Sequence, residues 1–227
     1  RTPLAIIKGY AEIIKKRRFA DEEIFEESID SIINETENMK NLVQKLLFLA
    51  KGEISKINTN FQIIEMKEFI QQIYNDTEVS TKTHKIYLER DDVYEIKADV
   101  TLLQQAIRAL LENAMKYSEK GTNVYIKSAI IDGKNGEVSI RDEGVGISEE
   151  DSRRIFDRFY RVDDSRTKAT GGTGLGLAIV KRIVELHKGE IKINSELGKG
   201  TEISIVLPLV TQKTEIVPQR LRTNKKI

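Results

Sequence analysis

The chain has 227 residues, with 37 Lys and Arg against 36 Asp and Glu, and it contains no cysteine. This nearly balanced charge gives no reason to expect nucleic acid or an anionic membrane surface as the main partner. The absence of cysteine excludes disulfides, thiol nucleophiles and cysteine-ligated metal sites, and no apolar run approaches the roughly 20 residues that span a bilayer. At this length, two modest structural units are expected.

The first predicted unit, residues 1–52, is a pair of antiparallel helices. From Phe25 onward, apolar side chains recur at alternating steps of three and four residues, as at Ile29 and Ile32, which is the pattern of a coiled-coil seam. Residues 4–14 repeat this spacing before a polar turn. A lone hairpin cannot bury stripes this wide, so two copies are expected to pair as a homodimeric four-helix bundle. The alternative is a hairpin packed against its own second domain.

A second unit is predicted to follow a polar linker at residues 53–60 and to span residues 61–210. Asp99 is a good N-cap for a strong helix that begins at Val100. The predicted strands are residues 61–64, 85–89, 94–97, 124–130, 138–140, 190–195 and 201–207, and the predicted helices are residues 66–79, 100–115 and 175–187. This order predicts an α+β sandwich with helices on one face of a mixed sheet. The basic residues 211–227 are expected to form a loose tail.

The end of the predicted helix at residues 100–115 carries the first of three polar motifs. Asn113 offers a neutral oxygen to a hard cation, which suits magnesium held mainly by phosphates and water. Lys116 lies one turn further along the same helix face and can neutralise phosphate charge. Taken alone, such a pair is typical of solvated helix surface.

The second motif, residues 142–148, follows a predicted strand. Asp142 is placed as a fixed acceptor for an adenine amino group, while Gly144 and Gly146 allow the backbone to approach a flat base closely. A plain turn is the alternative, and Ser148 is also a good helix start.

The third motif is a glycine-rich loop at residues 171–177, which opens the predicted helix at residues 175–187. Free backbone N–H groups and the positive end of the helix dipole form a phosphate cradle at such a place. The preceding segment is polar and loop-like, which argues against a Rossmann fingerprint, and no Gly-Lys-Ser/Thr follows, which argues against a Walker loop.

These three motifs, in this order, resemble the asparagine box and two glycine boxes of bacterial sensor histidine kinases. Phe-Asp-Arg-Phe-Tyr-Arg at residues 156–161 is similar to their phenylalanine box, and Gly-Lys-Gly-Thr at residues 198–201 is similar to their last glycine box. The opening Arg-Thr-Pro-Leu at residues 1–4 resembles the end of the histidine box, His-Glu-Leu-Arg-Thr-Pro-Leu. We therefore expect a chain truncated just after the phospho-accepting histidine, three residues before Arg1.

The resemblance implies a dimerisation and histidine-phosphotransfer hairpin followed by an ATP-binding α+β sandwich of the Bergerat (GHKL) type. It implies a protein-histidine kinase that moves the γ-phosphoryl group of ATP to the upstream histidine and then to an aspartate on the receiver domain of a response regulator. ATP would lie under a lid at residues 156–172, with Mg²⁺ on Asn113, a catalytic role for Lys116 and a phosphatase role for Thr2. The implied ATP-binding residues are Asn113, Lys116, Tyr117, Asp142, Gly144, Gly146, Arg161, Gly172, Thr173, Gly174, Leu175, Gly176 and Thr201.

The family also implies a cytoplasmic domain attached to the cell membrane through a segment outside this sequence. Two other functions remain open: a GHKL ATPase resembling gyrase, and a non-catalytic, nucleotide-binding dimeric scaffold that docks a response regulator. The ATPases place a water-activating glutamate four residues before the magnesium asparagine, where this chain has Ala109. The scaffold differs from a kinase only in its lack of activity.

The two histidines are expected to be structural. His84 lies among polar residues before a strand and should be solvated, whereas His187 ends a helix, where a cation favours the dipole and Gly189 can take the left-handed cap conformation. The fragment should therefore bind ATP without phosphorylating its family site. Packing or surface roles, rather than base stacking, are expected for Tyr10, Tyr74, Tyr87 and Tyr94.

Overall fold

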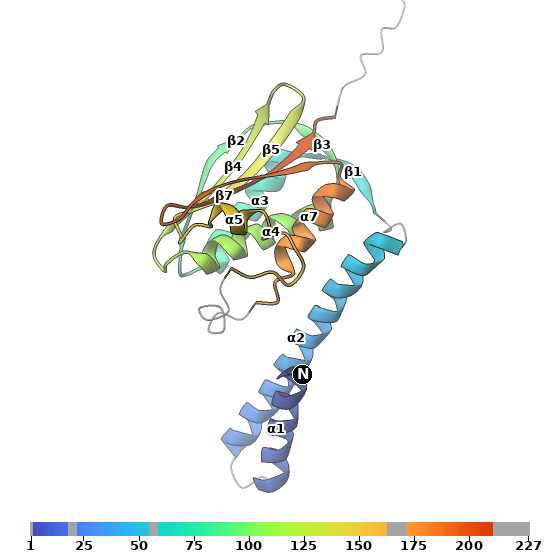
Figure 1. Ribbon diagram of the computed structural model, residues 1–227, viewed down its shortest axis with the longest axis vertical. Helices are drawn as coiled ribbons and strands as arrows, with labels where there is room; N and C mark the ends of the chain where they lie inside the picture. Colours follow the sequence, from blue (N-terminus) through green and yellow to red (C-terminus); the bar gives the residue numbers. More distant parts are fainter. Residues whose placement is uncertain (1, 18–21, 55–58, 163–171, 211–227) are drawn as a thin grey trace, which may run out of the picture.

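The computed structural model describes residues 2–17, 22–54, 59–162 and 172–210. These residues form a helical hairpin and an α/β domain, and one long helix of the hairpin reaches the side of the domain (Figure 1). The predicted tail and the middle of the predicted lid lie outside the described residues.

The hairpin consists of α1 (Thr2–Arg17) and α2 (Glu22–Ile54), which confirms the predicted pair of antiparallel helices. Helix α2 runs through Gly52, where the apolar pattern of the sequence ends, and stops at Ile54. An internal glycine costs a helix only about 1 kcal/mol relative to alanine, so it does not terminate a helix of 33 residues.

The α/β domain follows the predicted order of elements. They are β1 (Phe61–Glu65), α3 (Met66–Ser80), β2 (Lys85–Asp91), β3 (Glu95–Asp99), α4 (Val100–Tyr117), β4 (Asn123–Ile131), β5 (Asn135–Asp142), α5 (Glu149–Ser152), α7 (Gly176–Leu186), β6 (Glu190–Glu196) and β7 (Gly200–Pro208). The N-cap prediction is also confirmed, because Asp99 Oδ1 accepts a hydrogen bond of 3.1 Å from the backbone N–H of Leu102.

The main sheet has five strands in the order β2-β4-β5-β7-β6. The pairing of β2 with β4 is parallel and the other pairings are antiparallel, so the predicted mixed sheet is confirmed. Strands β1 and β3 form a separate antiparallel pair. The residues after β7 join this pair through the bridge between Ile96 and Leu209 and through a hydrogen bond of 2.9 Å from the Val210 N–H to the Glu95 carbonyl. Helices α3, α4 and α7 lie together on one face of the main sheet (Figure 1).

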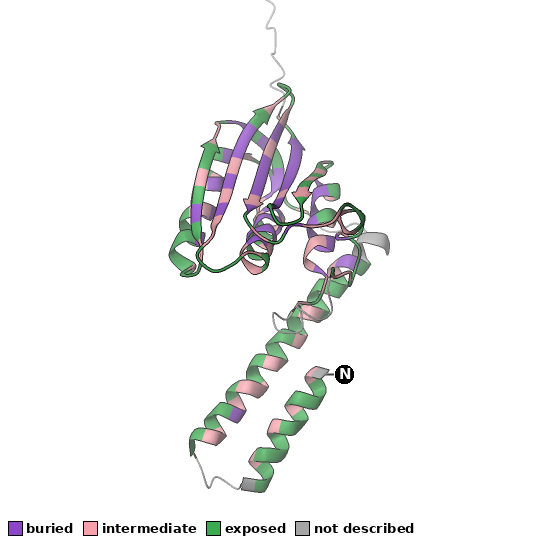
Figure 2. Ribbon diagram, turned by 60° about the vertical axis from the view of Figure 1, so that its left-hand side comes forward, coloured by how far each residue is buried: buried purple, intermediate pink, exposed green. Residues whose placement is uncertain are grey.

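The core lies between the sheet and these three helices. Helix α4 buries Leu103, Ile107 and Leu110 at helical spacing, and β4 buries Val124 and Ile126 at alternate positions. Each such side chain contributes roughly 1.5–3 kcal/mol by its removal from water. Figure 2 shows that buried residues gather in this layer, whereas the helical hairpin is mostly exposed.

The end of α2 joins this core, although the rest of the hairpin does not. The side chain of Leu49 is only 4% exposed, and the half-buried Leu42 and Phe48 pack against the same cluster. Other positions of the two helices instead expose large apolar side chains, namely Leu4, Ile33, Val43 and Leu47. The hairpin is therefore anchored at one end and leaves an apolar face uncovered within the described chain.

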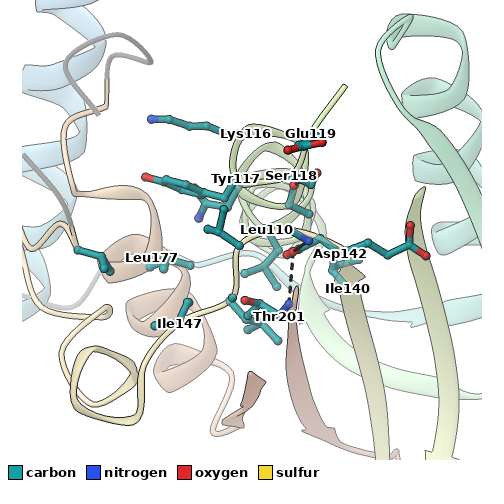
Figure 3. A pocket seen from close by; sticks show the side chains of 18 of the residues that line it. Leu110, Lys116, Tyr117, Ser118, Glu119, Ile140, Asp142, Ile147, Leu177 and Thr201 are labelled. Carbon is teal, nitrogen blue, oxygen red and sulfur yellow. Dashed lines mark hydrogen bonds between the residues drawn. The ribbon is translucent and has the colours of Figure 1, made fainter. Parts of the chain in front are cut away.

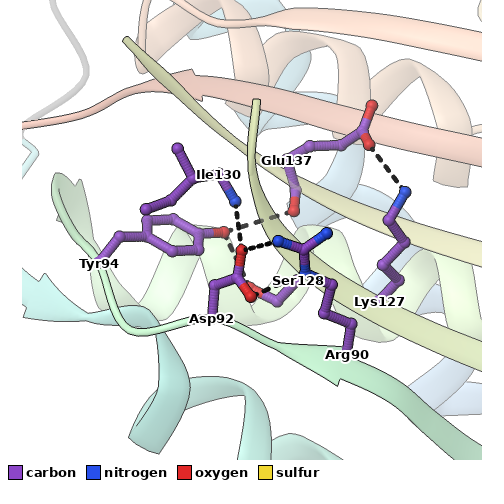
Figure 4. Close-up of polar contacts among 7 residues, drawn as sticks. All are labelled: Arg90, Asp92, Tyr94, Lys127, Ser128, Ile130 and Glu137. Carbon is purple, nitrogen blue, oxygen red and sulfur yellow. Dashed lines mark hydrogen bonds and ion pairs between the residues drawn. The ribbon is translucent and has the colours of Figure 1, made fainter. Parts of the chain in front are cut away.

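A polar cluster fastens the connection after β2 to the neighbouring strands (Figure 4). Asp92 accepts hydrogen bonds from the guanidinium of Arg90 at 2.7 Å and from the backbone N–H of Ile130 at 3.0 Å. The hydroxyl of Tyr94 lies 2.8 Å from Ser128 Oγ, and burial raises the pKa of Tyr94 to about 12. This confirms a packing role for Tyr94, whose ring also fills the space that a side chain at Gly136 would need.

His187 differs from its predicted role as a helix-terminal cation. Its Nδ1–H donates to the carbonyl of Ile183 at 2.7 Å, and Nε2 accepts the backbone N–H of Asp99 at 3.0 Å, so these two bonds require the neutral ring. The left-handed residue is Lys188, with φ of 57°, and not Gly189. Gly189 is required for another reason, because a Cβ there would lie 2.5 Å from the carbonyl oxygen of Val206.

His84 was expected to be solvated and is instead partly buried. Its Nε2 lies 3.1 Å from Ser118 Oγ and its Nδ1 lies 2.9 Å from Thr83 Oγ1. The imidazole therefore joins the start of β2 to the segment that follows α4.

Candidate functional site

A cavity of about 580 Å³ opens between the end of α4, the end of β5, the start of β7, the loop after β5 and the first turn of α7 (Figure 3). Its apolar walls include Leu110, Ile140, Ile147, Leu177 and Ile203. Its polar side chains lie mainly on α4 and at the end of β5. A volume of this size, with apolar walls and few polar groups, is typical of a small-molecule site.

Seven of the predicted site residues line this cavity: Asn113, Lys116, Tyr117, Asp142, Gly144, Gly146 and Thr201. The other predicted residues of the ATP site lie on the segment before the undescribed part of the lid or on the glycine-rich loop. Thr2 is at the start of α1 in the hairpin, so the structure does not bring it to the cavity.

Asp142 is the most constrained polar group of the site. The residue is 8% exposed, and its Oδ1 accepts the backbone N–H of Gly144 at 2.8 Å and that of Thr201 at 3.3 Å. Burial raises the pKa of this carboxyl, and the two backbone hydrogen bonds oppose that rise. Within the described chain both hydrogen bonds use Oδ1, so Oδ2 remains as an acceptor for a ligand.

The glycines after Asp142 are fixed by close contacts. A Cβ on Gly144 would lie 2.3 Å from the carbonyl oxygen of Tyr117, and a Cβ on Gly146, which has φ of 68°, would lie 2.0 Å from that of Glu196. Ser195 Oγ also accepts the backbone N–H of Ile147 at 2.8 Å. The loop is thus clamped between the end of α4 and the β6–β7 hairpin, and this contact explains the glycines better than a plain turn does.

A positive group lies in the last turn of α4. Burial, followed by the nearby charge of Arg161, lowers the pKa of the Lys116 amine. A Cβ on Gly172 would lie 2.4 Å from Lys116 Nζ, so the amine reaches the glycine-rich loop. Arg161 Nη2 is buried without a hydrogen-bond partner among the described residues, which fits a site that receives an anion.

The glycine-rich loop opens α7 as predicted, but its residues have different roles. Gly174 has φ of 68° and a Cβ there would lie 2.8 Å from the backbone of Phe159, whose N–H donates to the Gly174 carbonyl at 2.9 Å. Leu175 is 0% exposed as a whole residue and belongs to the hydrophobic core. Gly176 is the first residue of α7, and its missing side chain leaves open space.

Several lining residues were missed in the sequence, including Ser118, Glu119, Glu143, Val145, Val162 and Gly198. Glu143 and Val145 lie inside a recognised motif, so their place beside Asp142 and Gly144 was the available signal. Gly198 also lies inside a recognised motif, the last glycine box. Ser118 and Glu119 follow the end of α4, where no periodicity of the sequence marks them. Thr201 contributes its backbone N–H to Asp142 and its hydroxyl to Ser195 Oγ at 2.9 Å.

Comparison with protein families matches both parts of the chain. Residues 98–211 match the family described as histidine kinase-, DNA gyrase B- and HSP90-like ATPase, and residues 1–54 match the His Kinase A (phospho-acceptor) domain. The signal transduction histidine-protein kinase ArlS of Staphylococcus aureus is 36% identical over 213 residues, which are 91% of this chain and 46% of that protein. The chain thus spans about half the length of the curated relatives it matches.

Solved structures agree with these matches. The histidine kinase AdeS of Acinetobacter baumannii superposes with a TM-score of 0.72 and 26% identity, over 93% of this chain and 97% of that one. The histidine kinase ThkA, solved in complex with the response regulator protein TrrA, gives a TM-score of 0.69 and 26% identity, over 92% of this chain and 58% of that one.

Proposed function

Since the chain belongs to the sensor histidine kinases, with their phospho-acceptor and ATPase domains, we propose that it is the kinase core of a two-component signalling system. It binds ATP with Mg²⁺ and transfers the γ-phosphoryl group to a histidine upstream of Arg1, from which the group passes to an aspartate of a response regulator. The observation that carries this proposal is the cavity itself, which is lined by the buried Asp142 acceptor and by Lys116, whose amine senses the nearby charge of Arg161.

The polar groups of the cavity match different parts of ATP. Asp142 Oδ2 accepts a hydrogen bond from the exocyclic amino group of adenine, while Leu110, Ile140 and Ile203 provide apolar surface for the base. Lys116 and Arg161, whose Nη2 is buried, neutralise charge on the phosphates. Transfer to an imidazole then depends mainly on positioning and charge neutralisation around an in-line displacement.

The donor set fits magnesium that is held mostly by nucleotide and water. No group of three or more His, Cys, Asp or Glu that could hold a metal occurs in the part of the chain that the structure describes. Asn113 lines the cavity from α4 and offers one neutral oxygen. Bound there, Mg²⁺ would neutralise the negative charge of the phosphates during transfer.

An ATPase resembling gyrase has less support. Ala109, one turn before Asn113, carries no group that can activate water. Glu112 is exposed and is absent from the cavity lining, so it does not replace the missing carboxylate. A non-catalytic scaffold would keep the nucleotide site and differ only in phosphoryl transfer.

The hairpin supports a homodimer. Leu4, Ile33, Val43 and Leu47 are 51–61% exposed in the single chain, and a second hairpin would cover them in a four-helix bundle. The receiver domain of a response regulator is the second proposed partner, and Thr2 is proposed to assist its dephosphorylation. Within the described residues, no helix is both long and apolar enough to cross a bilayer. We place the chain in the cytoplasmic part of a membrane-attached kinase.

Calorimetric titration with a non-hydrolysable ATP analogue and Mg²⁺ tests the nucleotide site. The native chain should bind, Asn113→Ala should lose the magnesium dependence of binding, and Asp142→Ala should lose binding. Glu112→Ala is the matched control, because Glu112 neighbours Asn113 on α4 without lining the cavity. Absence of binding to the native chain would refute the ATP site.

Phosphoryl transfer needs the upstream histidine. A chain extended at its N-terminus through the histidine box should incorporate the γ-phosphate of labelled ATP into acid-labile, base-stable phosphohistidine, and replacement of that histidine by Gln should abolish the label. Binding of ATP without any incorporation would favour the scaffold over the kinase.

A further inference from the structure

The carboxylate of Glu143, next to Asp142, is tied to the start of β4. Tyr125 donates its hydroxyl to Glu143 Oε1 at 2.6 Å, and the Asn123 backbone N–H donates to Oε2 at 3.2 Å. The Asn123 side-chain amide lies 3.3 Å from Oε1 and 3.2 Å from Oε2. One carboxylate thus collects hydrogen bonds from two residues about twenty positions earlier in the chain.

The register of β4 against β5 brings these residues together. Val124 pairs with Asp142 and Tyr125 pairs with Arg141, so Asn123 and Tyr125 flank the strand position opposite Asp142. Side chains alternate along a strand, which places Asn123 and Tyr125 on one face and Val124 on the other. The chain leaves β5 at Asp142, and Glu143 reaches back to that first face.

Tyr125 is itself held in place. The Arg141 guanidinium lies 3.8 Å from the centroid of its ring, and Arg141 also pairs with Glu89 at 2.8 Å. The ring of Tyr87 stacks on Tyr125 with centroids 5.5 Å apart. The hydrogen bond from the Tyr125 hydroxyl is the main cause that lowers the pKa of Glu143. The Glu143 carboxylate therefore makes these hydrogen bonds in its ionised form at neutral pH.

The tethered residue lies between Asp142 and Gly144, which is one of the two residues whose N–H groups orient the Asp142 carboxylate. Gly144, which follows Glu143, donates its N–H to Asp142 Oδ1 at 2.8 Å, and the next residue, Val145, donates its N–H to the Tyr117 carbonyl at 3.3 Å. The end of α4 therefore holds one side of this turn, and the bonds of Glu143 to β4 hold the other. Release of the second side leaves the direction of Asp142 Oδ2 less determined.

We propose that Glu143 is a positioning residue for base recognition: Tyr125 and Asn123 hold its carboxylate, and this keeps Asp142 aimed at the exocyclic amino group of adenine. The proposal rests on the ATP site proposed above. It assigns Tyr125, a residue outside the nucleotide motifs, to the discrimination between nucleobases.

The test compares ADP with purine riboside diphosphate, which lacks the 6-amino group, by calorimetry in the presence of Mg²⁺. Tyr125→Phe keeps the ring and its stacking and removes only the hydroxyl. It should weaken ADP binding roughly 3- to 10-fold, the effect of one lost hydrogen bond, and leave the binding of purine riboside diphosphate nearly unchanged. The preference for ADP should fall by the same factor.

Two further variants and a control sharpen the test. Glu143→Gln keeps an acceptor for the Tyr125 hydroxyl and should retain part of the preference, whereas Glu143→Ala should lose as much as Tyr125→Phe. Tyr10→Phe is the matched control, because Tyr10 lies on α1 in the hairpin and does not line the cavity, and its change should leave both affinities intact.

The outcomes separate this proposal from the proposed function. A native chain that prefers ADP, with variants that keep the full preference, overturns the positioning role and leaves the ATP site standing. An equal loss for both nucleotides, together with a lower melting temperature, also overturns it, because general destabilisation does not depend on the 6-amino group. A native chain that binds neither nucleotide refutes the ATP site, and the positioning role falls with it.

Discussion

Replacement of Asp142 by Asn separates two consequences of burying this carboxylate, its effect on nucleotide affinity and its effect on the stability of the fold. Asn keeps an oxygen for the backbone N–H groups of Gly144 and Thr201, which now donate to Oδ1 at 2.8 and 3.3 Å. Because both N–H groups need an acceptor, the orientation of the amide is determined, and its NH₂ group takes the place of Oδ2. The variant therefore presents a donor where the native chain presents an acceptor.

Nucleotide affinity should fall as a result. A hydrogen bond to a charged group contributes about 1.5–3 kcal/mol, which corresponds to a loss of about 10- to 150-fold in Kd for ATP. Stability should change in the opposite direction, since the neutral amide avoids the desolvation that raises the pKa of Asp142. A gain of about 0.5–1 kcal/mol would raise the melting temperature by about 1–4 °C.

The gain in stability should be larger at neutral pH than in acid. The pKa of Asp142 is raised in the folded chain, so its contribution to stability is fully present below the ordinary aspartate value and is lost as pH rises through the folded value. The variant should therefore exceed the native chain most at neutral pH, and the difference should narrow as the solution is acidified.

Calorimetric titration with the ATP analogue measures the affinity, and thermal melts from about pH 3 to about pH 8, a range that includes the ordinary aspartate pKa of about 3.9, measure the stability. A lower melting temperature for Asp142→Asn at neutral pH, or an affinity for ATP equal to that of the native chain, would refute the assignment of a desolvated hydrogen-bond acceptor at this position.

Three other predictions concern the framework around the site. His187→Phe keeps a buried ring but leaves a buried backbone N–H without its acceptor, so thermal melts should show a loss of about 1–3 kcal/mol, against less than about 0.5 kcal/mol for the partly exposed His84→Phe; equal losses would contradict this. Gly146→Ala should lower the stability of the fold more than Gly133→Ala does, and it should also weaken ATP binding. Gly133 has nearly the same φ but open space around it, so Gly133→Ala measures the cost of backbone strain alone. Burial raises the pKa of Tyr94 to about 12, so its contribution to stability is present below about pH 10 and lost as pH rises towards 12; tyrosinate absorbance that titrates fully near pH 10 in the folded chain would exclude it.

The sequence alone was sufficient for features whose signals are local. Helix α4 was predicted from its N-cap at Asp99 and its apolar spacing, and the structure shows both. The nucleotide motifs were found because their chemistry depends on short spacings, such as that of Asn113 and Lys116 on one turn of helix. The end of α2 was harder to predict, because a single glycine weakens a helix without stopping it.

Tertiary structure alone decided which of these segments meet. Sheet order and strand register bring the Thr201 N–H to Asp142 across 59 positions of sequence, and they bring Tyr125 to Glu143. His187 was expected to be a helix-terminal cation from its neighbours in sequence, but the N–H of Asp99, 88 positions away, makes it a neutral acceptor. The periodicity of a segment indicates which of its faces is buried. It does not determine the register of that face against a partner strand, because register is set by packing between segments that are distant in the sequence.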